Sequence, residues 1–215
     1  MQHFINIDVE TITNGPLAEN CYLVVESASR HAIIVDPGDE ARRINRVVEK
    51  LGAKVSEIVC THGHIDHAGA VAELKTMLGA PFAIHPLDRP WIERMVESAT
   101  MLGFAPPKVP SIDRELANGQ QLLVGDVVGR VMHTPGHTLG GCCFFFPAQR
   151  IVFAGDTLFA SSVGRTDLAG GSHDQLLRSI RDHLLSLDDD VLVFCGHGKP
   201  TTIGRERRSN PFLRN

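Results

Sequence analysis

Three histidines and an aspartate crowd the six positions His62 to His67, within the stretch THGHIDHAGA. The stretch directly follows EIVC, an apolar run that is typical of a buried strand. His62 and His64 are two residues apart at the predicted strand end, so we expect both imidazoles to point the same way and meet one ion. Asp66 and His67 follow where the chain turns into a helix, near enough to hold a second ion. The H-x-H-x-D-H spacing therefore favours two metals.

Three later strand ends offer further ligands. Each is flanked by glycine, which lets the backbone approach a crowded centre. The candidates are His137 in HTPGHTLGG, Asp156 in FAGDTLF and His197 in FCGHGKP. One such residue alone usually makes ordinary turn hydrogen bonds, whereas seven together favour a metal site. Imidazole and carboxylate ligands suit Zn²⁺, Fe or Mn²⁺, and the absence of cysteine from the set favours an open, water-bearing site over a closed structural zinc site.

The elements that must position these residues are short β-rich runs, most of which end in Gly, Asp or His. They are CYLVVE, HAIIVDPG, EIVCTH, PFAIH, IVFAGD and VLVFCGHG. Buried strands with polar residues at their ends fit this pattern.

Helical patterns lie between these strands. One runs after Asp39 and stops at Gly52, and a second runs from about Ala68 to Leu78. RPWIERMVESATMLG places Trp91, Met95 and Leu102 near one helix face. SHDQLLRSIRDHLLSL opens with a Ser-x-x-Gln capping box. The proline-rich segment 104–111 divides the chain into two halves.

Length and composition bound the class of protein. The chain of 215 residues fits a single domain spanning residues 1–215. Its net charge of −4 gives no electrostatic reason to expect nucleic acid or an anionic membrane as a partner. No window approaches the roughly 20 apolar residues that cross a bilayer, and the N-terminus lacks a leader pattern, so we expect a cytoplasmic protein. The five cysteines are odd in number, without C-x-x-C spacing, and are expected to be reduced and buried.

Taken in order, these motifs resemble the metallo-β-lactamase superfamily over nearly the whole chain. The matching positions are Asp36, the HGHIDH block, His137, Asp156 and His197. The resemblance implies an α/β fold, a four-layer αβ/βα sandwich with two mixed sheets face to face, helices outside, and metals in a cleft at one sheet edge.

The resemblance also implies a role for each ligand candidate. One metal would be held by three histidines, which are His62, His64 and His137. The other would be held by an Asp-His pair and a later histidine, which are Asp66, His67 and His197. Asp156 would bridge the two ions, and Asp36 would orient a ligand.

Within the superfamily, VGRTDLAGG and the final GHGKPTTIGRERRSNPFL resemble the short, single-domain members of the glyoxalase II (hydroxyacylglutathione hydrolase) group. This implies a hydrolase with two divalent ions, for which we favour Zn over Fe or Mn. A metal-bridging hydroxide would cleave S-lactoylglutathione to lactate and glutathione, with Asp66 and Asp156 as the catalytic carboxylates. The chain stops soon after His197, so we expect no helical C-terminal domain of the kind that supplies much of the glutathione pocket in two-domain members.

Several alternatives remain open at this point. Persulfide dioxygenases share GRTD and hold a single iron through the equivalents of His62, His137 and Asp156. Lactone or other ester hydrolysis is a further alternative, whereas lactam hydrolysis and a non-catalytic metal-binding role are disfavoured. Arg165 either pairs with Asp167 or binds a carboxylate or amide of the thiol moiety. We expect a small-molecule thioester as the partner, and the sequence does not indicate an oligomeric state.

Overall fold

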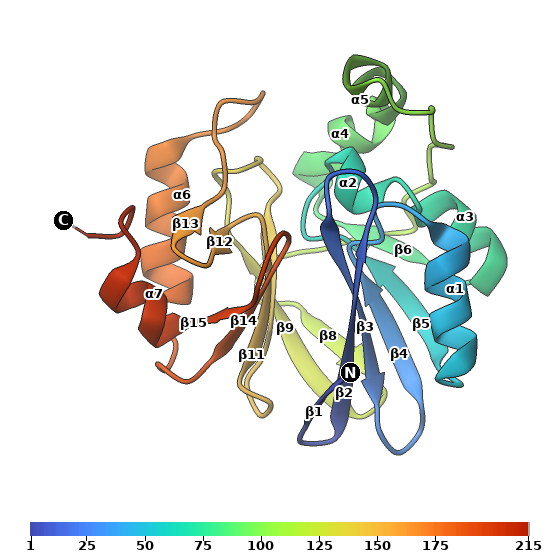
Figure 1. Cartoon of the computed structure of the whole chain (residues 1–215), viewed down its shortest axis with the longest axis horizontal. Coiled ribbons are helices and arrows are strands. Elements are labelled where there is room, and N and C mark those ends of the chain that lie inside the picture. Colours follow the sequence, from blue (N-terminus) through green and yellow to red (C-terminus); the bar gives the residue numbers. More distant parts are fainter. Residues whose placement is uncertain (215) are drawn as a thin grey trace.

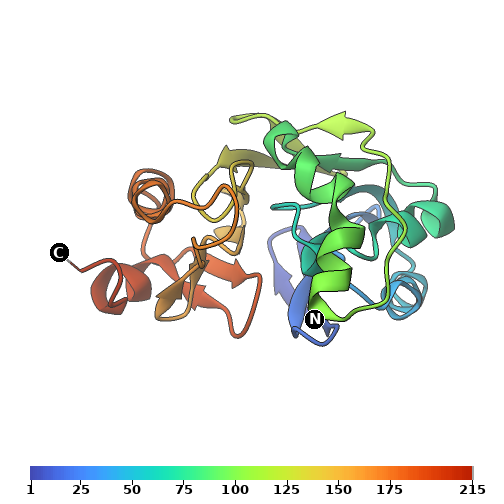
Figure 2. The same cartoon turned by 90° about the horizontal axis from the view of Figure 1, so that it is seen from above.

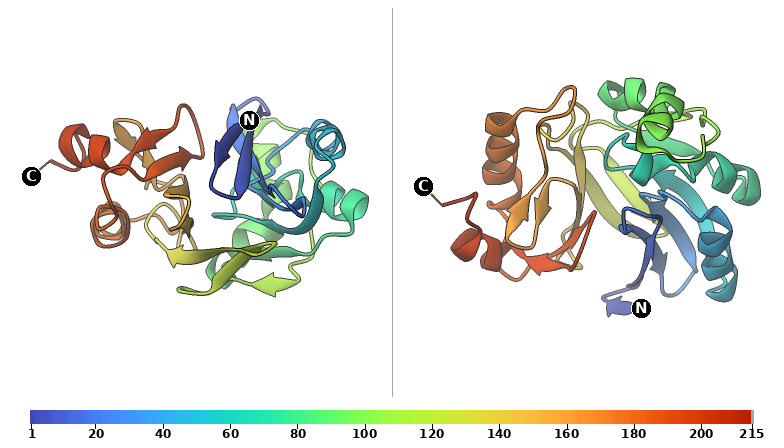
Figure 3. Two further views of the ribbon diagram at one scale, coloured as in Figure 1. Left: turned by 90° about the horizontal axis from the view of Figure 1, so that it is seen from below. Right: turned by 45° about the horizontal axis from the view of Figure 1, so that its top comes forward.

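Two β-sheets lie face to face with helices on their outer sides (Figure 1). This computed structural model describes residues 1–214, so the last residue of the expected 1–215 domain lies outside the described part. Blue to green segments occupy one side of the molecule and yellow to red segments the other (Figure 3). The four layers confirm the αβ/βα sandwich.

The first sheet follows sequence order from β1 to β7, antiparallel up to β4 and parallel from there on. Its strands are β1 (Gln2–Phe4), β2 (Ile7–Asn14), β3 (Glu19–Glu26), β4 (His31–Val35), β5 (Lys54–Val59), β6 (Phe82–Ile84) and β7 (Arg114–Glu115).

The second sheet has the order β15-β14-β11-β10-β9-β8, in which only β11 and β14 pair in parallel. Its strands are β8 (Gln121–Val124), β9 (Val127–His133), β10 (Cys142–Phe146), β11 (Ile151–Gly155), β14 (Leu192–Cys195) and β15 (Thr201–Thr202). A separate ribbon consists of β12 (Leu158–Phe159) and β13 (Ser162–Val163).

The helices cover the outer faces and one end of the sheets. On the outer faces lie α1 (Ala41–Lys50) and α3 (Val71–Leu78) against the first sheet, and α6 (His173–Ser179), a π-helical turn (Ile180–Leu184) and α7 (Ile203–Ser209) against the second. Seen from above, α4 (Arg89–Glu93) and α5 (Met95–Leu102) lie over the end of the first half (Figure 2). Near them are α2 (Ile65–Ala68) and a 3₁₀ helix (Pro86–Asp88).

An aromatic core holds the two sheets together. The rings of Phe153 and Phe194 stack with centroids 5.1 Å apart, and the Tyr22 ring lies 5.2 Å from each of them. These residues belong to a buried cluster drawn from both inner sheet faces. Burial of large apolar rings is a main source of folding free energy, so this layer fixes the two sheets relative to each other.

Most sequence predictions of elements are confirmed. All six apolar runs form strands, and helix α1 buries Ile44 and Val48 before Gly52 takes a left-handed φ of 60°. The Ser172 hydroxyl accepts a hydrogen bond from the Gln175 amide, as the capping box predicts. All five cysteines are free and buried. Among the described residues, no helix is long and apolar enough to span a bilayer.

Two sequence predictions of organisation are wrong. Arg94 leaves helical geometry (φ −103°, ψ 14°) and separates α4, which carries Trp91, from α5, which carries Met95 and Leu102, so the segment is not one helix with a single face. Within α5, Met95 is buried, whereas Leu102 at the last position is 48% exposed. The proline-rich segment is not the boundary between the halves, because the chain beyond it still pairs β7 with β6. The change of sheet comes later, between Glu115 and Gln121.

Candidate metal centre

The seven ligand candidates converge at the edge of the two sheets where strands β4, β5, β11 and β14 end. Parallel neighbours end at the same sheet edge, so β4 and β5 deliver their loops together, as do β11 and β14. His62 and His64 follow β5, while Asp66 and His67 lie on α2. The remaining three follow β9, β11 and β14, and they are His137, Asp156 and His197.

The first cluster consists of three buried histidines. His137 Nε2 lies 3.0 Å from His64 Nδ1 and 3.2 Å from His62 Nε2. The proximity of His62 and His64 was predicted, but the reason given was wrong. Strand β5 ends at Val59, so both residues lie in a loop, and loop geometry rather than the strand pleat brings their rings together.

The second cluster consists of Asp66, His67 and His197. Asp66 Oδ2 lies 3.3 Å from His197 Nε2 and 3.8 Å from His67 Nε2. The Asp156 carboxylate stands between the clusters, 3.4 Å from His67 Nε2, 3.6 Å from His137 Nε2 and 3.7 Å from His197 Nε2. One carboxylate thus faces histidines of both clusters, which is the placement that a bridging ligand requires.

The residues present fit divalent cations. Among the described residues, two buried atoms at the centre, His67 Nε2 and Asp156 Oδ1, have no hydrogen-bond partner. An unpaired buried polar atom typically costs about 1–3 kcal/mol. A cation coordinated by these atoms would remove that penalty, and imidazoles with carboxylates are ligands of Zn²⁺, Fe and Mn²⁺.

Histidines of the two clusters differ in the direction in which their pKa values are shifted. Burial lowers the pKa of His62 well below its ordinary value and lowers the pKa of His64 to about 3, so both imidazoles are neutral. For His67, burial also opposes the charged form, but the facing Asp156 and Asp66 carboxylates outweigh it and raise the pKa. Burial opposes ionisation of Asp156, but the facing His67 outweighs it and lowers the carboxyl pKa.

Asp36 occupies the position that the resemblance implied for a residue orienting a ligand. It is buried at the end of β4, with a left-handed φ of 52° that aspartate tolerates better than most residues. Its Oδ2 lies 3.1 Å from His67 Nδ1, and the carboxylate also accepts hydrogen bonds from the Thr61 amide and hydroxyl, both at 2.6 Å. His67 therefore presents Nε2 to the centre.

Arg165 contributes its backbone to this centre. His137 Nδ1 donates to the Arg165 carbonyl oxygen at 2.8 Å, which leaves the Nε2 lone pair of His137 directed at the first cluster. The Arg165 guanidinium is largely exposed and makes two hydrogen bonds to Asp167, at 2.7 and 2.8 Å. The local ion pair that the sequence suggested is thus present, and the substrate-binding role stays a prediction.

Asp88 is a buried carboxylate that the sequence analysis missed. It accepts hydrogen bonds from the Gly63 amide at 2.9 Å, the Thr138 hydroxyl at 2.8 Å and the Gly140 amide at 2.7 Å. These three donors come from the loop of His62 and His64 and from the loop of His137. Asp88 therefore fastens the two loops of the first cluster to each other. Its only sequence signal, an aspartate before a short helix, is that of an ordinary N-cap.

Strand β3 and the turn before it were also missed, and they hold the chain segment around His197 in place. The Tyr22 hydroxyl donates to the Cys195 carbonyl at 2.6 Å, and Asn20 Nδ2 donates to the same carbonyl at 3.1 Å. His197 Nδ1 in turn lies 3.1 Å from the Leu17 carbonyl oxygen. These contacts join residues far apart in the sequence and fix the position of His197 at the centre.

Glycine is required beside His197. A side-chain carbon at Gly196 would lie 2.2 Å from Asp156 Oδ1 and 2.7 Å from His67 Cε1. Only a residue without Cβ lets the chain pass this close to two ligand candidates. The glycine flanking His197 thus has the steric reason that the sequence suggested.

Comparisons with known proteins agree with this geometry. The family model described as Metallo-beta-lactamase superfamily matches residues 14–197, and the chain belongs to this superfamily. An uncharacterized protein of Aquifex aeolicus is 46% identical, with 95% of this chain and 96% of that protein covered. The hydroxyacylglutathione hydrolase GloC of Haemophilus influenzae is 36% identical, with 96% and 98% covered.

Two crystal structures superpose on nearly the whole chain. BLEG-1 B3 metallo-beta-lactamase superposes with a TM-score of 0.91 at 34% identity, covering 97% of this chain and 100% of that one. TTHA1623 in a di-iron-bound form superposes with a TM-score of 0.88 at 42% identity, covering 95% and 100%. Members of this superfamily bind divalent metals, and the two clusters described above are groups of residues that could hold such ions here.

Proposed function

We propose that this protein is a metal-dependent hydrolase of S-acylglutathione thioesters that converts S-lactoylglutathione to lactate and glutathione. The observation that carries the proposal is the place of Asp156, within 3.4–3.7 Å of histidines from both clusters. A carboxylate shared between two ligand sets is typical of two-metal hydrolytic sites. The similarity to GloC supports the thioester class of substrate.

The two metal ions would be held by different sets of residues. One ion would be bound by His62, His64 and His137. The other ion would be bound by Asp66, His67 and His197, and Asp156 would bind both ions. When bound, two such ions activate a water and polarise the substrate carbonyl, for which Zn is our first choice over Fe and Mn. Asp66 stays ionised because His67 and His197 outweigh its burial and lower its pKa. Asp156 is ionised for the same reason, so both catalytic carboxylates can accept a hydrogen bond that orients the attacking water.

Covalent catalysis by a cysteine is excluded by the surroundings of the thiols. All five cysteines are buried. Burial raises the pKa of every one of these thiols above its ordinary value, so none is a thiolate near neutral pH. We infer that the nucleophile is a water. The partner we propose is a small-molecule thioester in the cytoplasm, with no nucleic acid or membrane involved.

A substrate panel tests the proposal. Zn-, Mn- and Fe-loaded protein is assayed with S-lactoylglutathione, a small uncharged thioester, a lactone, a β-lactam and glutathione persulfide. We expect the largest kcat/KM for S-lactoylglutathione. Oxygen consumption with the persulfide in place of thioester hydrolysis would instead support the mononuclear dioxygenase. A β-lactam preference would ally the protein with BLEG-1, and a lactone preference would support the ester-hydrolase alternative.

A further inference from the structure

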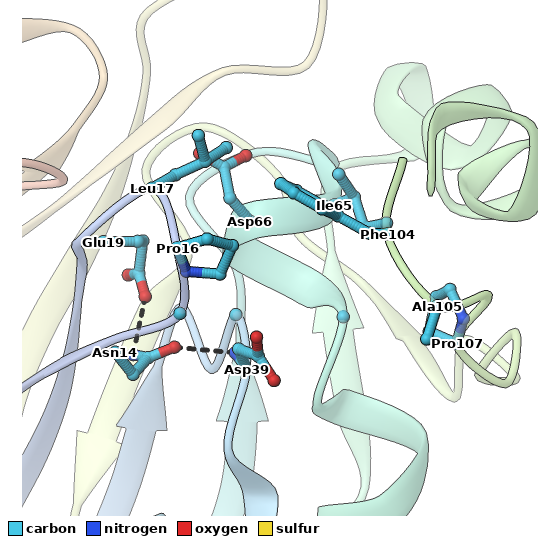
Figure 4. A pocket seen from close by; sticks show the side chains of 13 residues that line it. Asn14, Pro16, Leu17, Glu19, Asp39, Ile65, Asp66, Phe104, Ala105 and Pro107 are labelled. Atoms are coloured by element: carbon cyan, nitrogen blue, oxygen red, sulfur yellow. Dashed lines mark hydrogen bonds between the residues drawn. The ribbon is translucent and has the colours of Figure 1, made fainter. Parts of the chain in front are cut away.

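A cavity of about 250 Å³ lies beside the second ligand cluster (Figure 4). Its apolar wall comes from the β2–β3 loop, from α2 and from the segment that follows α5, through Pro16, Leu17, Ile65, Phe104 and Pro107. Asp66 belongs both to the cavity wall and to the second cluster. A group bound at the metal centre can therefore extend directly into the cavity.

The polar part of the wall is acidic. Glu19, Asp39 and Asp66 line the cavity, and none of its lining residues is a lysine, an arginine or a histidine. Glu19 is 1% exposed, and its Oε1 has no hydrogen-bond partner among the described residues, while Oε2 accepts from Asn14 at 2.9 Å. Burial raises the pKa of Glu19 well above its ordinary value, so the negative charge of the wall comes from Asp39 and Asp66. A ligand carboxylate placed here would face these charges with no cationic side chain in the wall, which disfavours binding.

The cationic side chain that could bind a ligand carboxylate, Arg165, lies on the opposite side of the metal centre. Arg165 lies outside the cavity wall, on the loop whose carbonyl oxygen holds His137 of the first cluster. The thiol arm of an S-acylglutathione carries carboxylates, and the acyl arm of S-lactoylglutathione carries none. The carboxylates of the thiol arm therefore suit the side of Arg165, and the acidic, apolar cavity suits the acyl arm.

We propose that this cavity is the acyl pocket of the enzyme, that it favours uncharged apolar acyl groups, and that it rejects acyl groups bearing a carboxylate. The inference rests on the proposed thioester hydrolysis and adds the acyl selectivity to it. Pockets for drug-sized ligands occupy about 300–1,000 Å³, so a cavity of this size suits a short acyl chain. Phe104 and Ile65 lie close to each other on one side of the cavity, where they would face an acyl chain (Figure 4).

The first test compares S-acylglutathiones that differ only in the acyl group: acetyl, butanoyl, hexanoyl and succinyl. Burial of one methylene contributes about 0.8 kcal/mol, which corresponds to about fourfold in kcat/KM. We expect kcat/KM to rise about two- to fourfold for each added methylene up to hexanoyl. We expect succinyl to fall at least tenfold below butanoyl. A flat series, or a preference for succinyl, overturns the inference.

A matched pair of variants locates the effect. Phe104→Ala should lower the ratio of hexanoyl to acetyl kcat/KM about tenfold, because it removes an aromatic wall. Val109 lies in the same proline-rich segment, is outside the cavity wall and is 46% exposed. Val109→Ala should therefore leave the ratio of hexanoyl to acetyl kcat/KM unchanged. Asp39→Asn should raise kcat/KM for succinyl relative to butanoyl. If both the hexanoyl-to-acetyl ratio and the succinyl-to-butanoyl ratio of kcat/KM are the same in all three variants as in the wild type, the pocket assignment is overturned.

A binding measurement separates this inference from the proposed function. Titration of the metal-loaded protein with hexanamide, followed by NMR, needs no turnover. Saturable binding that Phe104→Ala weakens and Val109→Ala preserves supports the pocket even if no thioester is hydrolysed, in which case only the proposed function fails. Thioester hydrolysis without chain-length preference, together with no hexanamide binding, leaves the proposed function standing and overturns the pocket.

Discussion

The two ligand clusters of this protein differ in burial and in charge. His62, His64 and His137 are all buried and are accompanied by no carboxylate of their own. In the second cluster, the side chains of Asp66 and His197 expose 19% and 28% of their surface. The first cluster therefore consists of buried imidazoles alone, whereas the second includes a carboxylate and is partly accessible.

The supports of the two clusters differ in the same way. Asp88 joins the two loops of the first cluster through three hydrogen bonds to backbone and hydroxyl donors. The second cluster is held by Asp36, whose carboxylate faces the ring of His67 directly. Moreover, only the second cluster shares a residue with the wall of the 250 Å³ cavity. We therefore expect the first cluster to retain its metal more firmly and the second to contact the substrate.

The largest effect is expected where the two clusters meet. Asp156→Asn replaces the shared anion by a neutral amide that can coordinate through one oxygen only. We expect both metals to bind more weakly and kcat/KM for S-lactoylglutathione to fall about 10³-fold or more, because both parts of the site are affected. Metal content by mass spectrometry and steady-state kinetics check the prediction. A variant with two tightly bound metals and full activity would refute the bridge.

Single-cluster variants should separate the sites. His67→Ala or His197→Ala should lose the second metal selectively, whereas His62→Ala or His137→Ala should lose the first, since each removes a ligand that only one of the two ions would use. Metal stoichiometry after dialysis measures the loss. If the protein is a mononuclear dioxygenase, the His67 variant keeps its iron and consumes oxygen with glutathione persulfide.

Variants of Asp88 and Asp36 test whether each of these carboxylates supports one cluster separately. Asp88→Asn turns an acceptor toward the Gly63 or Gly140 amide into a donor, so we expect the first metal to bind about 10- to 100-fold more weakly. Asp36→Asn removes the charge beside His67 and should weaken the second metal by a similar factor. Competition with a fluorescent chelator gives both affinities. Identical losses from both sites in each variant would show that the clusters are not separately supported.

Acidification should remove the second metal first. A metal can bind His67 only after displacing its proton, and the raised pKa of this group means that the proton already competes near neutral pH. As the pH falls below that pKa, the second site should lose up to about tenfold in affinity per pH unit. His64, with its pKa lowered to about 3, binds no competing proton in this range. Metal titrations between pH 8 and pH 5 test the order, and loss of the first metal at the higher pH would contradict it.

The smallest effect concerns Arg165. If its planar guanidinium leaves Asp167 to hold a carboxylate of the thiol arm, Arg165→Ala should raise KM for S-lactoylglutathione about 3- to 10-fold. Metal content and hydrolysis of a small uncharged thioester should hardly change. Equal losses on both substrates would favour the structural role of the ion pair.

The sequence by itself determined the strands and the ligand candidates. Alternation, β-branched runs and glycine positions report on neighbours within a few residues, and HGHIDH keeps four of the candidates within six positions. The same local view also explains the failures. A break at Arg94 split the predicted helix into α4 and α5, and the rings of His62 and His64 met through a loop instead of a strand.

Tertiary structure alone decided how the centre is supported and what lies beside it. The Asp88 bonds join positions 25, 50 and 52 residues apart, and the bond from Tyr22 to Cys195 spans 173. The cavity combines a turn before β3, the helix α2 and the segment after α5. Periodicity carries no information about such separations, because packing of the two sheets sets which distant loops meet. The chemistry of the ligands is therefore readable in the sequence, whereas their orientation and the acidic, apolar surface beside them arise only when the sheets close on each other.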